Sequence, residues 1–441
     1  MIAARGRGGI ASASRVARPS SRNAAAFGRD SCGCARIVRF VGGRVRAWGD
    51  GGGGDLVGFR AEQIQLGNRP YAQLQLQRTV NTSSDGIPTQ QSDEVATAAF
   101  YQATIVSGRF TGRDVLIKVY PALDAEIDAL AANEIASHCA LQASGGSEDS
   151  IAQLVGGFES EDGAKCLVFE PSGIYDAAYW LAQASKTNRG LGAPASASKP
   201  KANNLLGWLG GPNLDVNRRQ AFALTVIRRV LEAVAFMHEN DRLHQCIGPS
   251  SVVLNTPREY ELGSLDVRLR DLCFSVDVSD AALRGGATLA ELWEAGEASG
   301  GSGGRAGSTT LASEAELWRR ARLDGGCTTH FQQRNYGIAD DVFQAGLLAL
   351  TVVFVALSDA DTFPIEEGAL VRLVTLTFAG DFGGGFREYV REDPKCAGAV
   401  AWLDEHRGWE LLGAMLDADW RKRPTAASCL VHPFITQPLK Y

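Results

Sequence analysis

The pattern of apolar and polar positions divides the chain into a strand-rich first half and a helix-rich second half. Apolar and polar residues alternate in YAQLQLQRTV, which starts at Tyr71, and strand-like runs recur in AAFYQATIVSG and RDVLIKVYP. The helically spaced segment DAEIDALAANEIASHCALQ follows, and IAQLVGGF and AKCLVFEP then indicate a hairpin. These elements predict a five-stranded, mostly antiparallel sheet with one helix inserted after the third strand.

The second half is dominated by two strong helix patterns. RRQAFALTVIRRVLEAVAFMHEND is amphipathic at helical spacing, and IADDVFQAGLLALTVVFVAL is nearly all apolar, which predicts a buried central helix. Between them HQCIGPSSVVLN, residues 244–255, has the form of a tight loop that leads into a short strand. Ser- and Gly-rich stretches at about 185–213 and 284–308 are expected to be flexible insertions. No uninterrupted apolar run reaches about 18 residues, so no transmembrane segment is expected.

The N-terminal segment has a composition of its own. Residues 1–46 contain ten Arg, no Lys and a single acid, Asp30, among Ala, Ser and Gly. Arg- and Ser-rich, acid-poor N-termini are typical of organelle transit peptides. We therefore expect a disordered transit peptide over 1–47 and a Gly-rich linker over 48–70, with the chloroplast as destination and the mitochondrion as the alternative. A basic tail that binds nucleic acid or membrane is the other interpretation of this segment.

The rest of the chain is acidic, with 34 basic and 49 acidic residues after the N-terminal segment is removed. An acidic surface repels nucleic acid, so no nucleic-acid partner is expected. The nine cysteines and six histidines do not form the spaced clusters that bind zinc, and a chain of this length does not need a disulfide framework.

Several short motifs, in the same order as the elements, resemble those of protein kinases. VLIK is similar to the V-A-I-K strand and NEIASH to the helix C segment, which implies that Lys118 and Glu134 form the ion pair of a nucleotide site. LVFEP resembles the hinge entry, with Phe169 at the gatekeeper position and Glu170 after it. RDLC lies at the D-F-G position, which makes Asp271 the metal-binding carboxylate by resemblance.

The C-terminal motifs extend the resemblance over about 360 residues. HQCIGPSSVVL aligns without a gap with H-R-D-L-K-P-E-N-V-L-L, DDVFQAG is similar to helix F, and DADWRKRPTAASCLVHPF is similar to the terminal kinase signature. The resemblance implies an α+β, two-lobed protein kinase-like domain over 71–441. Its N-lobe, about 71–170, would hold the five-stranded antiparallel sheet and helix C. Its C-lobe, about 171–437, would be mainly helical.

The loop has lost the residues that act in the family. Cys246 occupies the position of the catalytic Asp, and a thiol with a pKa of about 8.5 is mostly neutral at pH 7 and a poor base. Gln245 and Gly248 replace an Arg and a Lys, and Ser251 replaces the Asn that would bind a second metal ion. The glycine-rich loop is reduced to a single glycine, Gly86. Ordinary kinase turnover is therefore not expected.

The main hypothesis is a catalytically impaired pseudokinase that acts as a scaffold or allosteric regulator of an unknown protein partner. Two interpretations of Lys118, Glu134 and Asp271 stay open: they bind ATP with one Mg²⁺, or they form a buried ion-pair set that orients helix C. Ser251 would be a second, weaker metal ligand. His244 is expected to be a core histidine that holds the loop backbone rather than a general base, and Asp341 is expected to anchor the backbone amides of the loop.

The alternative hypothesis is a divergent serine/threonine protein kinase that transfers the γ-phosphate of ATP to protein substrates. Its base would be Cys246, or a carboxylate from another segment such as Asp266 or Asp277. A third hypothesis is a thiol-gated regulator that uses Cys246 and Cys273 as a redox pair.

Overall fold

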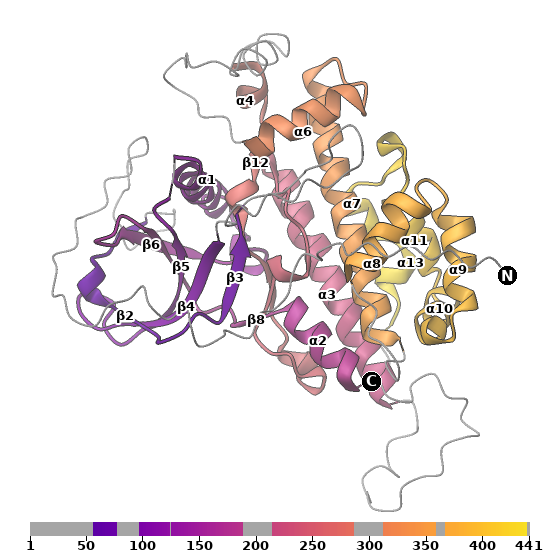
Figure 1. Ribbon diagram of the computed structural model, residues 1–441, viewed down its shortest axis with the longest axis horizontal. Helices are drawn as coiled ribbons and strands as arrows, with labels where there is room; N and C mark the ends of the chain where they lie inside the picture. Colours follow the sequence, from indigo (N-terminus) through magenta and orange to yellow (C-terminus); the bar gives the residue numbers. More distant parts are fainter. Residues whose placement is uncertain are drawn as a thin grey trace, which may run out of the picture.

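The computed structural model describes residues 56–76, 97–123, 125–187, 214–285, 312–358 and 367–438. The predicted transit peptide, the segment around Gly86 and most of the two Ser- and Gly-rich insertions lie outside the described residues. The described part is a mixed α+β architecture with a curled sheet in the N-terminal part and a helical C-terminal part (Figure 1). This arrangement is consistent with the kinase-like fold that the motifs imply.

The N-terminal sheet contains the five predicted strands and two more. The predicted strands are β3 (Ala72–Gln75), β4 (Thr97–Ile105), β5 (Asp114–Tyr120), β6 (Leu154–Glu159) and β7 (Lys165–Phe169). The additional strands are β1 (Val57–Gly58) and β2 (Ile64–Leu66), so the sheet order is β1-β6-β7-β5-β4-β2, with β3 also paired to β4. All pairs are antiparallel except β1 with β6. The expectation of a five-stranded sheet is therefore corrected to seven strands.

The two additional strands lie where the sequence predicted a linker over 48–70. Leu56, Phe59 and Ile64 are buried in the sheet core. These few apolar residues follow a glycine run and do not form the apolar–polar alternation that predicts a strand. The pairing of β1 with β6 also depends on Gly156, because a Cβ atom at that position would lie 1.9 Å from the carbonyl oxygen of Val57. The strands β1 and β2 within this segment thus belong to the sheet.

Helix α1 (Ala125–Gln142) follows β5, as predicted, and packs beside the sheet against β5, β6 and β7 (Figure 1). Its apolar side packs into a core with the sheet and with the 3-10 turn Leu272–Phe274 from the C-terminal half. Asn133 fixes this contact, because its side-chain amide donates to the carbonyl oxygens of Cys273 (2.9 Å) and Ser275 (2.8 Å). The helix therefore ties the two halves together beside β5.

The helical part is built on α3 (Leu214–Glu239) and α7 (His330–Leu357), which pack against each other as the two predicted long helices. Around them lie α2 (Ala177–Thr187), α4 (Asp280–Gly285), α6 (Ala312–Leu323), α8 (Glu367–Arg372), α9 (Arg387–Glu392), α10 (Ala397–Glu405), α11 (Gly408–Met415), α12 (Ala426–Leu430) and α13 (Pro433–Thr436). Within the described ranges α7 alone is long and apolar enough to cross a membrane, and it is mostly buried by the protein, as a core helix would be.

Short strands at the junction of the two halves hold the candidate loops. β10 (Val252–Leu254) lies between β11 (Val267–Leu269) and β8 (Tyr175–Asp176), and β9 (Arg242–Leu243) pairs with β12 (Val276–Asp277). The loop after β9 and the turn after β11 are therefore brought together. They face the sheet from the helical side.

Candidate functional site

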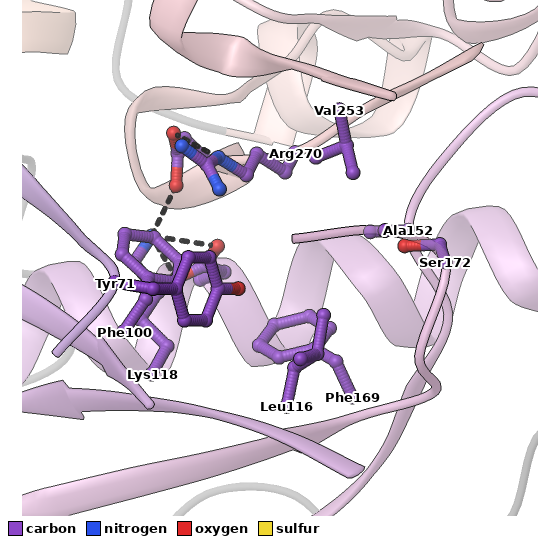
Figure 2. A pocket seen from close by; sticks show the side chains of 12 residues that line it. Tyr71, Phe100, Leu116, Lys118, Ala152, Phe169, Ser172, Val253 and Arg270 are labelled. Carbon is purple, nitrogen blue, oxygen red and sulfur yellow. Dashed lines mark hydrogen bonds and ion pairs between the residues drawn. The ribbon is translucent and has the colours of Figure 1, made fainter. Parts of the chain in front are cut away.

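A buried ion-pair set lies between the sheet and the helical part. Lys118 on β5 places its Nζ 2.9 Å from Oε2 of Glu134 on α1 and 2.8 Å from Oδ1 of Asp271, which follows β11 (Figure 2). All three side chains are almost completely buried. The structure thus brings together the three residues that the sequence singled out, from segments up to 153 positions apart.

The charges of this set are held by their mutual contacts. Burial acts to lower the pKa of Lys118, but Asp271 and Glu134 outweigh it and raise that pKa above its usual value. Burial likewise acts to raise the pKa of Asp271, and the positive charges of Lys118 and Arg270 bring it below its usual value. The pKa of Glu134 is raised by burial against the opposing effect of Lys118, and its Oε2 accepts a hydrogen bond from the Tyr120 hydroxyl.

Asp271 reaches the set through an unusual backbone conformation. Its φ of 70° and ψ of 47° lie in the left-handed region, which few residues other than glycine adopt. Such strain is tolerated where the surrounding contacts fix the side chain, as the ion pair with Lys118 does here.

Arg270, which precedes Asp271, is the site residue that the motif comparison missed. Its guanidinium donates from Nε to the carbonyl oxygen of Ser250 (3.0 Å) and from Nη2 to Oδ2 of Asp176 (3.2 Å). The same Nε lies 3.3 Å from Oδ2 of Asp271, an ion pair without an aligned hydrogen bond. The guanidinium also covers the ring of Phe100 on β4, with 4.4 Å from its carbon to the ring centroid. A basic residue directly before Asp271 was the available signal.

Arg270 and the ion-pair set form one end of a pocket between the two halves (Figure 2). The pocket has a volume of about 320 Å³ when the space open to solvent is included. Its lining residues are Tyr71, Phe100, Leu116, Lys118, Glu134, Ala152, Phe169, Ser172, Gly173, Val253, Arg270 and Asp271. Tyr71 packs against Phe100 with ring centroids 6.1 Å apart, and burial raises its pKa to about 12, so its hydroxyl stays protonated.

The other end of the pocket is the predicted hinge. Phe169 lines it and meets the ring of His138 edge-on at 5.3 Å, as a bulky residue between the pocket and α1. The backbone N–H of Glu170 donates to the carbonyl oxygen of Gln153 (2.9 Å). The carbonyl oxygen of Glu170 accepts from the N–H of Ser172 (2.8 Å). The Glu170 side chain is not among the lining residues.

The loop after β9 is held from below by one carboxylate. Oδ2 of Asp341, on α7, accepts from the backbone N–H of His244 (2.7 Å) and Oδ1 from that of Gln245 (2.8 Å). Gln245, with a φ of 63°, also folds its side-chain amide onto Oδ1. His244 is fully buried with its Nε2 3.0 Å from the carbonyl oxygen of Arg270. The predicted structural roles of His244 and Asp341 are confirmed.

The loop positions that would act in the family carry no acid. Cys246 is partly buried, and its backbone N–H donates to Nδ1 of His244 (3.2 Å). The Ser251 hydroxyl is turned back on the loop, where it donates to the carbonyl oxygen of Gly248 (2.9 Å) and accepts from its N–H (3.0 Å). Ser251 is therefore a loop-closing residue, and its predicted role as a metal ligand does not fit this geometry.

The geometry does not favour the other candidate bases, Asp266 and Asp277, or the proposed thiol pair either. Asp266 is paired with Arg268 (2.9 Å) and Asp277 with Arg242 (2.9 Å), and neither lines the pocket. Burial raises the pKa of the Cys273 thiol well above its usual value. A protonated, buried thiol reacts slowly in disulfide exchange, which weakens the hypothesis that Cys246 and Cys273 are a redox pair.

The contacts of the two Asp271 carboxylate oxygens show whether a magnesium ion fits beside them. One of its oxygens is bonded to Lys118 and the other faces Arg270, so a divalent cation there would lie against two positive charges. Mg²⁺ requires about six oxygen ligands in octahedral geometry, and in the described part of the chain no cluster of three His, Cys, Asp or Glu side chains offers a metal site. The residues present do not fit a metal ion while Arg270 stays in place.

Comparisons with known proteins add little to this geometry. No protein-family model and no curated protein matches the chain. A matching solved structure is the crystal structure of the Rad53 kinase domain and SCD2, at 14% identity, with 78% of this chain and 86% of that chain covered and a TM-score of 0.41. A likeness at this level concerns the fold alone and says nothing of activity or ligands.

Proposed function

We propose that the chain is a protein kinase-like protein without phosphoryl-transfer activity, a pseudokinase that acts as a scaffold or allosteric regulator of a protein partner. One observation carries this proposal. The only carboxylates among the lining residues are Glu134 and Asp271, and both are bonded to the buried Lys118. A kinase needs a further carboxylate to accept the proton of the substrate hydroxyl, and Cys246 stands where it would be.

The alternative, a divergent serine/threonine kinase, needs a base that the pocket does not offer. A buried ion-pair set can fix geometry without a ligand, because each member is costly to leave unpaired. Lys118, Glu134 and Asp271 would then serve to hold α1 against the sheet. The proposed role of this set is structural, and the partner would bind a surface whose shape the set maintains.

A phosphoryl-transfer assay tests the proposal. The full chain is incubated with labelled ATP, Mg²⁺ or Mn²⁺ and generic protein acceptors, beside the variants Lys118→Met and Asp271→Asn. We expect the wild type to incorporate no more labelled phosphate into the acceptors than either variant does. Incorporation by the wild type that both substitutions abolish would show an active kinase and overturn the proposal.

The predicted chloroplast targeting belongs to the same proposal but has a separate test. A fluorescent protein fused to residues 1–50 is expected to enter chloroplasts. Entry into mitochondria would favour the alternative, and a fusion that stays in the cytosol would contradict the transit peptide.

A further inference from the structure

Three oxygen-bearing groups converge on the guanidinium of Arg270. They are the carboxylates of Asp176 and Asp271, 3.2 and 3.3 Å away, and the carbonyl oxygen of Ser250, 3.0 Å away. Arg270 is 6% exposed, so these contacts are made inside the protein. Oxygen ligands of this kind, two carboxylates and a backbone carbonyl, are also those that hard divalent cations prefer.

The guanidinium also joins the two halves of the molecule. Asp176 on β8 and Ser250 in the loop belong to the helical part, whereas Phe100 on β4, whose ring lies under the guanidinium, belongs to the N-terminal sheet. The backbone N–H of Arg270 is itself fixed by the carbonyl oxygen of Ser251 (2.9 Å). A side chain that is anchored in one half therefore closes on the other (Figure 2).

The hinge end of the pocket is closed by internal bonds as well. The carbonyl oxygen of Glu170 and the N–H of Ser172 bond to each other at 2.8 Å. A ligand that bonded to the Ser172 N–H would have to break this bond, since an N–H group donates to one partner at a time. The polar groups of Arg270 at one end of the pocket and of Glu170 and Ser172 at the other are thus bonded to other groups of the protein.

We propose that Arg270 is a built-in cation that takes the place of a metal–nucleotide complex and holds the two halves closed without a ligand. The inference rests on the proposed function and deepens it, because a scaffold whose closed shape is fixed from within needs no ATP. Arg270 would act by its contacts with Asp271, Asp176 and Phe100, which hold these residues of the two halves in place.

Complementation by metal ions separates this role from that of an ordinary ion pair. In Arg270→Ala, Asp176 loses its cation and Asp271 keeps only Lys118, and space opens beside the two carboxylates. We expect the melting temperature of this variant to fall by several degrees relative to the wild type, and Mg²⁺ or Mn²⁺ alone at millimolar concentration to restore part of the loss. The wild type should show no shift with either ion or with Mg²⁺ and ATP together.

Two variants control the measurement. Arg268→Ala removes an arginine from the same segment, where it is paired with Asp266 near the surface, and should cost less stability and gain nothing from metal ions. In the double variant Arg270→Ala/Asp271→Asn the rescue by metal ions should disappear, because one of the two carboxylates is gone. Full-length protein is used throughout, with thermal unfolding followed by circular dichroism.

Several outcomes would overturn the inference. They are a metal- or nucleotide-dependent shift of the wild type, a loss in Arg270→Ala no greater than in Arg268→Ala, and a loss in Arg270→Ala that metal ions do not restore. A wild-type shift without phosphoryl transfer would overturn this inference and leave the proposed function standing. Phosphoryl transfer by the wild type would overturn the proposed function itself.

Discussion

His138 on α1 should make the protein sensitive to acid. Its side chain is fully buried beside Phe169, and neither ring nitrogen has a hydrogen-bond partner. Burial, with a smaller contribution from the charge of Lys118, lowers its pKa from 6.5 to about 3. The folded protein therefore holds this histidine neutral at pH values where the unfolded chain protonates it.

The sign and size of the effect follow from proton linkage. Between pH 6.5 and pH 3 the unfolded chain binds more protons at this site, so stability falls as the pH falls through this range. At pH 5 the two pKa values correspond to a loss of about 2 kcal/mol relative to neutral pH. Replacing the ring by a leucine of similar size removes the titrating group and the two unpaired nitrogens, each of which is costly when buried.

Urea unfolding of the wild type and His138→Leu at pH 7.5 and pH 5 tests this reasoning. We expect the free energy of unfolding of His138→Leu to be equal to or above that of the wild type at pH 7.5. The variant's advantage should grow by about 2 kcal/mol at pH 5. The comparison at pH 7.5 accounts for the changed packing, so only the growth reports the titration. An advantage that is the same at both pH values would refute the burial of a neutral histidine.

Three further substitutions test other parts of the structure by urea unfolding. Lys118→Met leaves the buried Glu134 without an ion-pair partner and Asp271 with Arg270 alone, and should cost about 3–5 kcal/mol, whereas a cost below about 1 kcal/mol would contradict the buried ion-pair set. Gly156→Ala pushes a Cβ into the carbonyl oxygen of Val57 and should cost about 1–3 kcal/mol, with Gly145→Ala, which meets open space, as its neutral control. Asp341→Asn weakens the charge-assisted bonds to the backbone N–H groups of His244 and Gln245 and should cost about 2 kcal/mol, and no measurable cost would show that the loop does not depend on this anchor.

The periodicity of the sequence was sufficient for the long elements and for the motifs that lie on them. The helix at 125–142, the paired strands around Lys118 and the buried α7 occur where the pattern predicted them, because each is long enough for its apolar pattern to be read from the sequence. The strands β1 and β2 were not predicted, because two or three residues are too few to establish a periodic pattern. Their burial depends on long-range pairing, which a local pattern does not contain.

The sequence was sufficient to predict the site residues that lie in a recognisable motif. It was not sufficient to predict the role of Arg270, which lies beside the motif residue Asp271 in the pocket. Lys118, Glu134 and Asp271 could be found from short matches, and the structure places Nζ of Lys118 within 3 Å of an oxygen of each carboxylate. Arg270 could not, since its role depends on Asp176 and on Phe100, which lie far away in the sequence. Such convergence is a property of the fold, and the motif that includes Asp271 shows a basic residue before it but not the groups that this residue contacts.

The anchoring of the loop after β9 is independent of the side chains at 246 and 248. The bonds that fix it run from Asp341 to backbone N–H groups and from His244 to a backbone carbonyl oxygen. None of them uses the side chains at 246 or 248. Gln245 even adds a bond to Asp341 from the position where the family has an arginine. The shape of the loop thus depends on atoms other than the side chains at 246 and 248, and Arg270 lies against the neighbouring carboxylates of Asp176 and Asp271.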